Sequence, residues 1–171
     1  RPPVKLEFHY GAAIAASGST PETPAEDSTH WEMGSETKLF TGLLLAQMAP
    51  TDADGTCAAG AAVCLSDPIS KHLPAKTVAQ IGPEKAAITL LQLATHTSGL
   101  PDDPPNLDAG CPLIPGTKKH EACPNWRALY SDDLMWQGVA QADLQFAPGQ
   151  QGKGLYSDLG FAILGAILVD V

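Results

Sequence analysis

Ser35 and Lys38 have the residue types and the spacing that nucleophilic chemistry requires. Residues three positions apart on a helix lie on the same face, about one turn from each other. A serine hydroxyl is a weak nucleophile until a base accepts its proton, and a lysine amine can be that base when its surroundings lower its pKa. Ser-x-x-Lys also arises by chance, so on these residues alone a capping serine beside a solvated lysine is the better interpretation.

The segment around this pair predicts a helix. Apolar residues follow Ser35 at helical spacing, namely Leu39, Phe40, Leu43 and Leu44. Serine is favoured at a helix start, and Glu36 places negative charge in the first turn. We therefore expect Ser35 at the N-terminus of a largely buried helix that ends at Pro50. There the Ser35 backbone N–H can help to stabilise an oxyanion.

Short strands are expected before this helix. Alternating apolar residues at Val4, Leu6 and Phe8 predict one strand, because successive side chains of a strand point to opposite faces. A second short strand is expected over residues 12–16. Residues 18–29 are rich in glycine, serine, threonine, proline and acidic residues, which predicts a loop.

Further helices are expected downstream. Thr89 has the character of an N-cap, and the apolar pattern behind it predicts a short helix that is closed by Ser98 and Gly99 and stopped by Pro101. The remaining segments are a proline-rich loop over 101–125, a weaker helical pattern over 127–145, a glycine-rich loop over 146–160, and a last apolar helix from about Asp158 to Val169.

The composition is that of a globular chain, with 44% hydrophobic and 17% charged residues. The formal net charge of -9 repels phosphate backbones and anionic membranes, which argues against nucleic acid as a partner. No stretch reaches the roughly 18 uninterrupted apolar residues that a membrane span needs. Nothing in the sequence indicates an oligomeric state.

The four cysteines form two local pairs in loop sequence, Cys57 with Cys64 and Cys111 with Cys123. Their spacing matches no usual zinc or redox pattern. We expect two disulfides that close these loops, although four cysteines allow three connectivities. Disulfides place the protein in an oxidising compartment, the periplasm or outside the cell, whereas four buried thiols in a cytosolic protein are the alternative.

Five stretches, in order along the chain, resemble serine β-lactamases and penicillin-binding proteins, most closely class C β-lactamases, DD-peptidases and family VIII esterases. The stretches are WEMGSETK with TGLLLA (residues 31–46), LSDPI (65–69), ITLLQLATHTSGLP (88–101), FAPG with LYSDLGF (146–161) and LGAIL (164–168). The resemblance implies a partial α+β fold of the β-lactamase/DD-peptidase kind in one domain. It would consist of short N-terminal strands of an antiparallel sheet within 1–30 and a mainly helical region over 31–171.

The resemblance also implies a function. The protein would be a serine hydrolase that forms an acyl-enzyme with β-lactams, D-Ala-type peptides or small esters, without metal or cofactor. Ser35 would attack the carbonyl, Lys38 would hold the proton network, and Tyr156 would transfer a proton to the leaving group. His96 falls in a segment that forms a structural turn in the family, which favours a structural role over catalysis.

One residue departs from the family pattern, because Asp158 stands where asparagine is usual. Asparagine can donate a hydrogen bond to a substrate carbonyl, whereas an ionised aspartate can only accept. We therefore expect Asp158 to pair with Lys38, to keep it protonated, and to disfavour substrates that carry a carboxylate.

The third motif of the family, Lys/His-Thr/Ser-Gly on a C-terminal strand, has no counterpart here. We expect the chain to be a fragment that lacks the C-terminal part of the sheet, with a degenerate form as the alternative. Two rival functions follow from these departures. One is an esterase without β-lactam turnover, and the other is a non-catalytic binding protein with an incomplete site.

Overall fold

The structure, a computed structural model, describes residues 8–53, 55–112, 115 and 126–171. The chain divides into two compact units, Arg1–Glu36 and Thr37–Val171, and each is considered by itself. The first unit carries a small antiparallel sheet and the second is helical, which confirms a partial α+β chain.

The N-terminal unit contains two short strands. Strand β1 (Ala12–Ile14) pairs antiparallel with β2 (Thr23–Pro24), and reciprocal backbone hydrogen bonds between Ser17 and Thr20 close the turn between them. Strand β1 lies where a strand was expected, but β2 falls in a segment for which the composition predicts a loop. Its pairing comes from the turn at 17–20, which the composition does not reveal. The strand expected around Val4 and Leu6 lies outside the described residues.

The helical unit accounts for most of the chain. Its elements are α1 (Thr37–Met48), the 3-10 turn η2 (Ile69–Lys71), α2 (Ala75–Ile81), α3 (Pro83–Ala86), α4 (Leu90–Ala94), α5 (Trp126–Leu129), α6 (Asp132–Gln141) and α7 (Asp158–Asp170). Helix α4 begins as predicted, because Thr89 and Gln92 form a reciprocal capping box. Helices α2 and α3 lie in a segment for which no helix is predicted.

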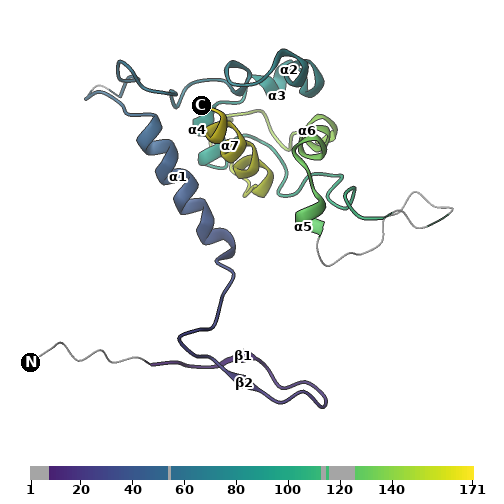
Figure 1. Cartoon of the computed structure of the whole chain (residues 1–171). Coiled ribbons are helices and arrows are strands. Elements are labelled where there is room, and N and C mark those ends of the chain that lie inside the picture. The colour runs from purple at the N-terminus through teal and green to yellow at the C-terminus, as the bar shows by residue number, and fades with distance from the viewer. Residues whose placement is uncertain (1–7, 54, 113–114, 116–125) are drawn as a thin grey trace, which may run out of the picture. The chain divides into compact units, whose positions relative to one another are not determined.

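Helix α7 is the centre of the helical unit. It packs against α1 and α4, while α2 packs against α6, and Figure 1 shows α7 in yellow between these elements. The apolar residues of α7 lie on several sides of the helix, so contact with more than one neighbouring helix stabilises it. Its buried members are Leu159, Gly160, Ile163, Leu164, Ile167 and Leu168. The position of α7 therefore determines where its first residue, Asp158, lies.

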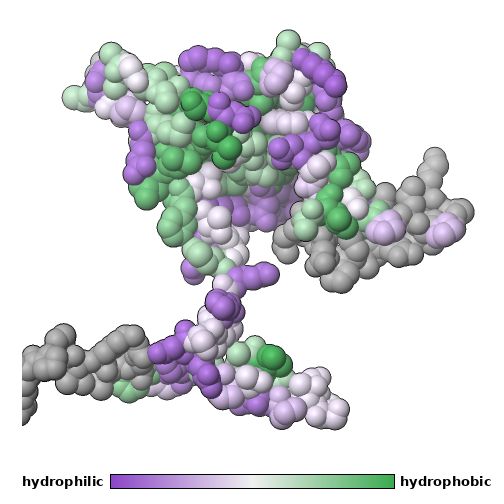
Figure 2. Space-filling model, in the orientation of Figure 1, coloured by the Kyte–Doolittle hydropathy of each residue, from purple (hydrophilic) through white to green (hydrophobic). Residues whose placement is uncertain are grey.

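Helix α1 differs from the prediction of a largely buried helix. Leu45 is its buried residue, whereas Leu39, Phe40 and Leu43 are 74%, 61% and 58% exposed. Figure 2 shows hydrophobic residues at the surface along this helix. The helical spacing correctly predicts one apolar stripe, but burial also requires an element to cover it. Within the described part of the helical unit, no element covers this stripe.

The segments 96–99 and 145–149 are joined through their backbones. Gly99 has φ +78° and its carbonyl accepts a hydrogen bond from the Gln145 N–H at 2.8 Å. A Cβ at Gly99 would collide with the Phe146 carbonyl oxygen. Only glycine therefore allows this left-handed turn to approach the neighbouring segment so closely.

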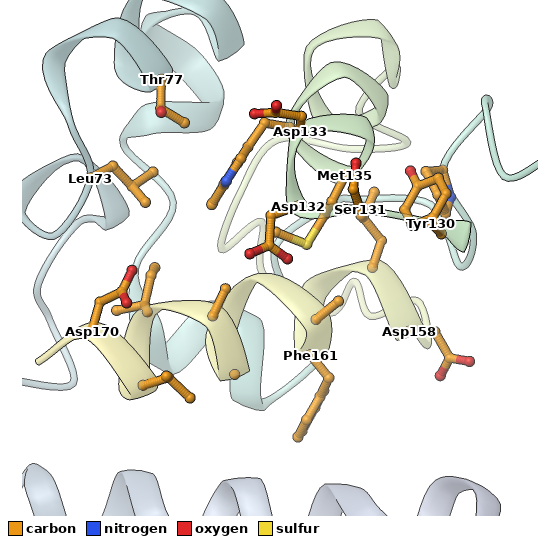
Figure 3. Close-up of a pocket in the computed structure, with 18 of the residues that line it drawn as sticks. Leu73, Thr77, Tyr130, Ser131, Asp132, Asp133, Met135, Asp158, Phe161 and Asp170 are labelled. Atoms are coloured by element: carbon orange, nitrogen blue, oxygen red, sulfur yellow. The ribbon is translucent and has the colours of Figure 1, made fainter. Parts of the chain in front are cut away.

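A groove of about 840 Å³ runs along α7 between α6 and residues 73–77 and 103–107. In Figure 3, Asp158 lies at one end of α7 and Asp170 at the other, with Asp132 and Met135 across the groove. The lining combines apolar residues, such as Leu107 and Ala162, with aspartates, among them Asp132 and Asp158.

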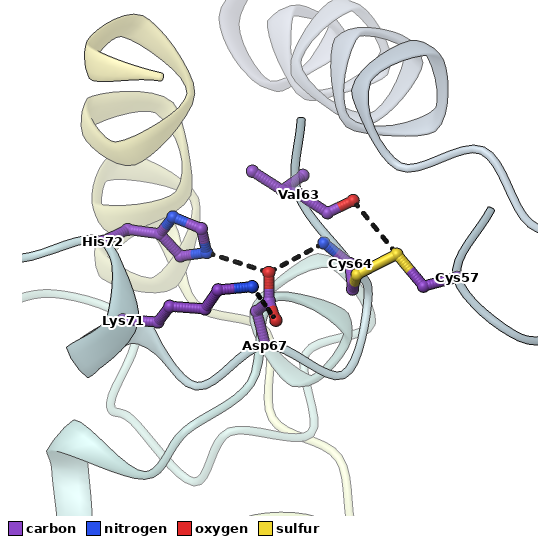
Figure 4. Close-up of polar contacts among 6 residues, drawn as sticks. All are labelled: Cys57, Val63, Cys64, Asp67, Lys71 and His72. Atoms are coloured by element: carbon purple, nitrogen blue, oxygen red, sulfur yellow. Dashed lines mark hydrogen bonds and ion pairs between the residues drawn. A yellow bond between two sulfur atoms is a disulfide. The ribbon is translucent and has the colours of Figure 1, made fainter. Parts of the chain in front are cut away.

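Asp67 anchors the loop that follows α1. Its carboxylate accepts hydrogen bonds from the Cys64 N–H at 2.8 Å, the Lys71 ammonium at 2.8 Å and His72 at 3.1 Å (Figure 4). Burial opposes ionisation of this side chain, but these three hydrogen bonds together lower the pKa of Asp67 below its ordinary value. The ionised form is therefore the one that the fold stabilises.

The disulfide predicted between Cys57 and Cys64 is confirmed. It closes the loop beside Asp67, as Figure 4 shows. The second predicted pair, Cys111 with Cys123, stays a prediction because Cys123 lies outside the described residues. Among the helices of the described residues, none has the length and apolar character that crossing a bilayer requires.

We expect Asp67→Asn to lower the free energy of unfolding by about 2 kcal/mol at pH 7, because charged hydrogen bonds are lost at a buried site. The pKa of Asp67 is lowered from 3.8, so its stabilising effect is present above pH 3.8 and is lost as the pH falls through the folded-state pKa. Urea unfolding of both proteins from pH 7 to pH 3 should show the difference shrinking in acid. Asp143→Asn, at an exposed carboxylate, is the charge-matched control. Equal effects of the two substitutions would contradict the role given to Asp67.

Gly99→Ala should lower the free energy of unfolding by about 3 kcal/mol, because it adds both left-handed strain and a backbone collision. Gly165→Ala is the matched control, since a Cβ there meets no atom within 4 Å and alanine favours a helix. Thermal unfolding should therefore show a large loss for the first variant and no loss for the second. A Gly99→Ala variant as stable as the wild type would show that the close approach of segments 96–99 and 145–149 is not required.

Candidate active site

Ser35 lies in the N-terminal unit, in the 3-10 turn η1 (Gly34–Glu36) that directly precedes α1 in the chain. Gly34 has φ +53°, and the Glu36 N–H donates to the Met33 carbonyl at 3.2 Å. The Ser35 side chain is exposed. The expected helical start around Ser35 is thus present, as a short tight turn.

Lys38 and Asp158 come together from the first turns of two packed helices, α1 and α7. The Lys38 ammonium donates to the Asp158 carboxylate in an ion pair, in which the lysine side chain is 18% exposed and the aspartate side chain 52% exposed. Partial burial opposes the charged form of Lys38. The hydrogen bonds and negative charges of Asp158 and Tyr156 outweigh burial and raise the pKa of Lys38 above its ordinary value. Lys38 is therefore an ammonium at neutral pH and cannot accept a proton while this pair is intact.

Tyr156 lies beside the same ammonium group. Lys38 Nζ is 4.8 Å from the centroid of the Tyr156 ring and 5.7 Å from that of Phe161, both within the range of cation–π attraction. The Tyr156 ring also contacts His96, with 4.7 Å between ring centroids. The tyrosine is 43% exposed.

The segment that carries Tyr156 is held by hydrogen bonds to residues 96–102. The bonds run from the Leu155 N–H to the His96 carbonyl, the Ser157 N–H to His96 Nδ1, the Ser157 hydroxyl to the Pro101 carbonyl, the Asp158 N–H to Asp102 Oδ1, and the Leu159 N–H to the Asp102 carbonyl. Each of residues 155, 157, 158 and 159 thus has a partner on the other segment. The backbone on both sides of Tyr156 is fixed.

Ser157 and Asp102 position the start of α7. Ser157 is fully buried, and its hydroxyl oxygen accepts from the Gly160 N–H at 2.9 Å as an N-cap while donating to the Pro101 carbonyl at 2.7 Å. Asp102 accepts from two further N–H groups of the same helix start. Sequence reasoning did not identify either residue as a positioning group. A serine before an apolar helix is a visible capping signal, but the partner at 101–102 is apparent only in three dimensions.

The site residues predicted from the sequence are therefore partly assembled. Lys38, Tyr156 and Asp158 meet in the helical unit, and Ser35 precedes Lys38 by three positions in the chain. The groove along α7 meets this cluster at Asp158 and Phe161. Within the described part of the chain, no group of three or more His, Cys, Asp or Glu side chains could hold a metal ion.

Comparison with known proteins identifies relatives of this chain. It is 29% identical over 147 residues to "Protein flp" of Staphylococcus aureus (strain N315), which covers 86% of this chain and 24% of that protein. It is 31% identical over 140 residues to the D-alanyl-D-alanine-carboxypeptidase/endopeptidase AmpH of Escherichia coli (strain K12), which covers 81% of this chain and 29% of that protein. The chain thus spans about a quarter of the length of these curated relatives.

No solved structure gives a significant match to this chain. The family model described as Beta-lactamase, in contrast, matches residues 7–171, which is nearly the whole sequence. The motif around Ser35 and Lys38 and the Tyr156 segment both lie within that match. The chain therefore belongs to the Beta-lactamase family.

Proposed function

We propose that this chain carries the nucleophile and proton-transfer groups of a serine hydrolase that works through an acyl-enzyme. The observation that carries the proposal is the meeting of Lys38, Tyr156 and Asp158 at the starts of α1 and α7. In a Beta-lactamase-family chain, this cluster lies one helical turn in sequence from a serine at a helix start. The relative named as a carboxypeptidase supports an acyl-transfer reaction.

In the proposed reaction, Ser35 Oγ attacks the carbonyl carbon of the substrate, and its proton passes to the oxygen of Tyr156. The bond to the leaving group then breaks, and Tyr156 delivers the proton to that group. A water molecule repeats the sequence on the resulting ester, releasing the acid and restoring Ser35. The Lys38 ammonium stabilises negative charge on the Tyr156 oxygen, which is the role that its raised pKa permits.

Three substrate classes fit this chemistry, namely β-lactams, D-Ala-type peptides and small esters. The half-exposed Asp158 carboxylate favours the last of these. A second negative charge 4 Å away meets a repulsion of roughly 1 to 4 kcal/mol as the effective dielectric constant falls from that of water to that of a protein surface. β-Lactams and D-Ala peptides carry a carboxylate and small neutral esters do not. We therefore favour an esterase with weak β-lactam turnover.

The nucleophile is tested by the mass of the intact protein after treatment with a fluorophosphonate. We expect one adduct on the wild type and none on Ser35→Ala, because the phosphorus must bond to Ser35 Oγ. Ser28→Ala, at another exposed serine of the same unit, should be labelled like the wild type. An adduct that survives in Ser35→Ala would place the nucleophile elsewhere, and a wild type without adduct would favour a non-catalytic binding protein.

The charge of Asp158 is tested by comparing nitrocefin, which carries a carboxylate, with a neutral p-nitrophenyl ester. For Asp158→Asn we expect the ratio of kcat/KM for nitrocefin to that for the ester to rise about tenfold, since about 1.4 kcal/mol of repulsion is removed. The substitution also removes the first partner that raises the pKa of Lys38, so the lysine should become neutral at lower pH.

Asp132→Asn is the matched control, because Asp132 is exposed at the groove and its substitution changes the net charge by the same amount. It should leave the ratio of the two substrates unchanged. If Asp158→Asn also leaves the ratio unchanged, Asp158 does not select against anionic substrates.

A further inference from the structure

His96 contacts the Tyr156 segment on both sides of the tyrosine. Its backbone carbonyl accepts the Leu155 N–H at 2.9 Å, and its Nδ1 accepts the Ser157 N–H at 3.1 Å. Its ring lies against the rings of Tyr156 and Phe161, with 4.7 Å and 5.0 Å between centroids. One residue thus bonds the backbone before and after Tyr156 and packs on the ring between them.

The backbone of His96 has an unfavourable conformation. Its φ of +57° is left-handed, and among the described residues no other residue except glycine has a positive φ. His96 follows the last residues of α4, where the Thr97 N–H donates to the Gln92 carbonyl and the His96 N–H donates to the Leu93 carbonyl. This is the Schellman pattern, whose left-handed position is usually glycine. A side chain there costs about 1 kcal/mol, so histidine at this position needs a compensating role.

We propose that His96 is a positioning residue for Tyr156, a role that rests on the proposed function: its neutral imidazole accepts the Ser157 N–H and so fixes the tyrosine beside Lys38. The left-handed turn directs the ring to the Tyr156 segment, and the Nδ1 lone pair is the group that holds it. Glycine would make the turn at lower cost but would leave the Ser157 N–H without this acceptor.

The hydrogen bond from the Ser157 N–H to His96 depends on the protonation state of the imidazole. A protonated imidazole carries a hydrogen on both nitrogens and cannot accept from an N–H group. Burial first, and then the charge of Lys38, lower the pKa of His96 below 6.5, while Asp158 and Asp102 act in the opposite direction. Tyr156 and Phe161 complete its surroundings. The bond is therefore present at neutral pH and is lost as the pH falls through the folded-state pKa of His96.

The free energy of unfolding changes with pH in the same direction as this hydrogen bond. Below pH 6.5 the unfolded chain binds a proton at this residue more readily than the folded chain does. The free energy of unfolding therefore decreases as the pH falls from 6.5 to the folded-state pKa, and it becomes level below that pKa.

Two variants of the intact protein separate the side chain from the turn. His96→Gly keeps the left-handed turn and removes the acceptor. His96→Asn also tolerates a positive φ, and it retains an acceptor near the place of Nδ1 that does not titrate. Hydrolysis of a p-nitrophenyl ester gives kcat and KM from pH 5 to pH 8, thermal unfolding gives stability, and the Ser157 amide is followed by hydrogen exchange.

For His96→Gly we expect a kcat about 10- to 100-fold lower, a KM within about twofold of the wild type, and a melting temperature that is unchanged or lower by a few degrees, because relief of the left-handed strain offsets part of the lost hydrogen bond. For His96→Asn we expect a kcat within about fivefold of the wild type at pH 7, without the loss of activity that we expect of the wild type as the pH falls through the folded-state pKa of His96. His9→Asn, at a half-exposed histidine of the N-terminal unit, is the control, and this variant should still lose activity as the pH falls. If His96 served only to make the turn, glycine, which adopts a positive φ without strain, would keep full activity.

The two proposals fail in different ways. If the wild type neither hydrolyses the ester nor forms an adduct at Ser35, the proposed function fails, and the positioning role fails with it. If the wild type is active but His96→Gly has the same kcat, His96 does not position Tyr156. If the Ser157 amide is protected from hydrogen exchange as well in His96→Gly as in the wild type, the hydrogen bond to His96 is refuted whatever the activity. If His96→Asn still loses activity as the pH falls, protonation of His96 is not the cause of that loss.

Discussion

The hydrogen bonds between residues 96–102 and residues 155–159 are the constraint on which the site depends. The partners are 56 to 61 positions apart in the sequence, and both segments are irregular or lie at a helix start. Backbone polar groups of such segments need partners when they are removed from water, and here each segment supplies the partners of the other. This arrangement fixes the first turn of α7, and with it the places of Tyr156 and Asp158.

Once α7 is fixed against α1, the charges at the two helix starts determine the electrostatic environment of Tyr156. A cation near a helix N-terminus is disfavoured by the helix dipole, so the Lys38 ammonium depends on Asp158 and Tyr156 for its stability. An anion at the start of α7 is favoured by the same dipole, which suits Asp158. The pair therefore supplies a fixed positive charge next to the Tyr156 ring and a negative charge facing solvent. In the reaction that we propose, the first stabilises a phenolate and the second favours neutral substrates.

Features that rest on local sequence could be predicted, whereas those that rest on distant contacts could not. The Thr89 cap, the apolar helix α7 and the Cys57–Cys64 disulfide each need only a few neighbouring residues, and each is present. The exposure of α1 differs from the prediction because a stripe of apolar residues says nothing about what covers it. The resemblance to a family predicted that Lys38, Tyr156 and Asp158 share a site, whereas their positions in the sequence alone did not predict it. The partners of Ser157 lie across the fold, so no local signal could reveal them.

The central proposal is that Ser35 is the nucleophile and that the Lys38–Asp158 pair and the fixed Tyr156 serve its reaction. A crystal structure of the intact protein after reaction with a fluorophosphonate tests it most directly. We expect the phosphorus bonded to Ser35 Oγ, with Lys38 still paired to Asp158 and the Tyr156 oxygen within hydrogen-bonding distance of an oxygen on the phosphorus. Phosphorus bonded to another residue, or Tyr156 turned away from the adduct, would contradict it.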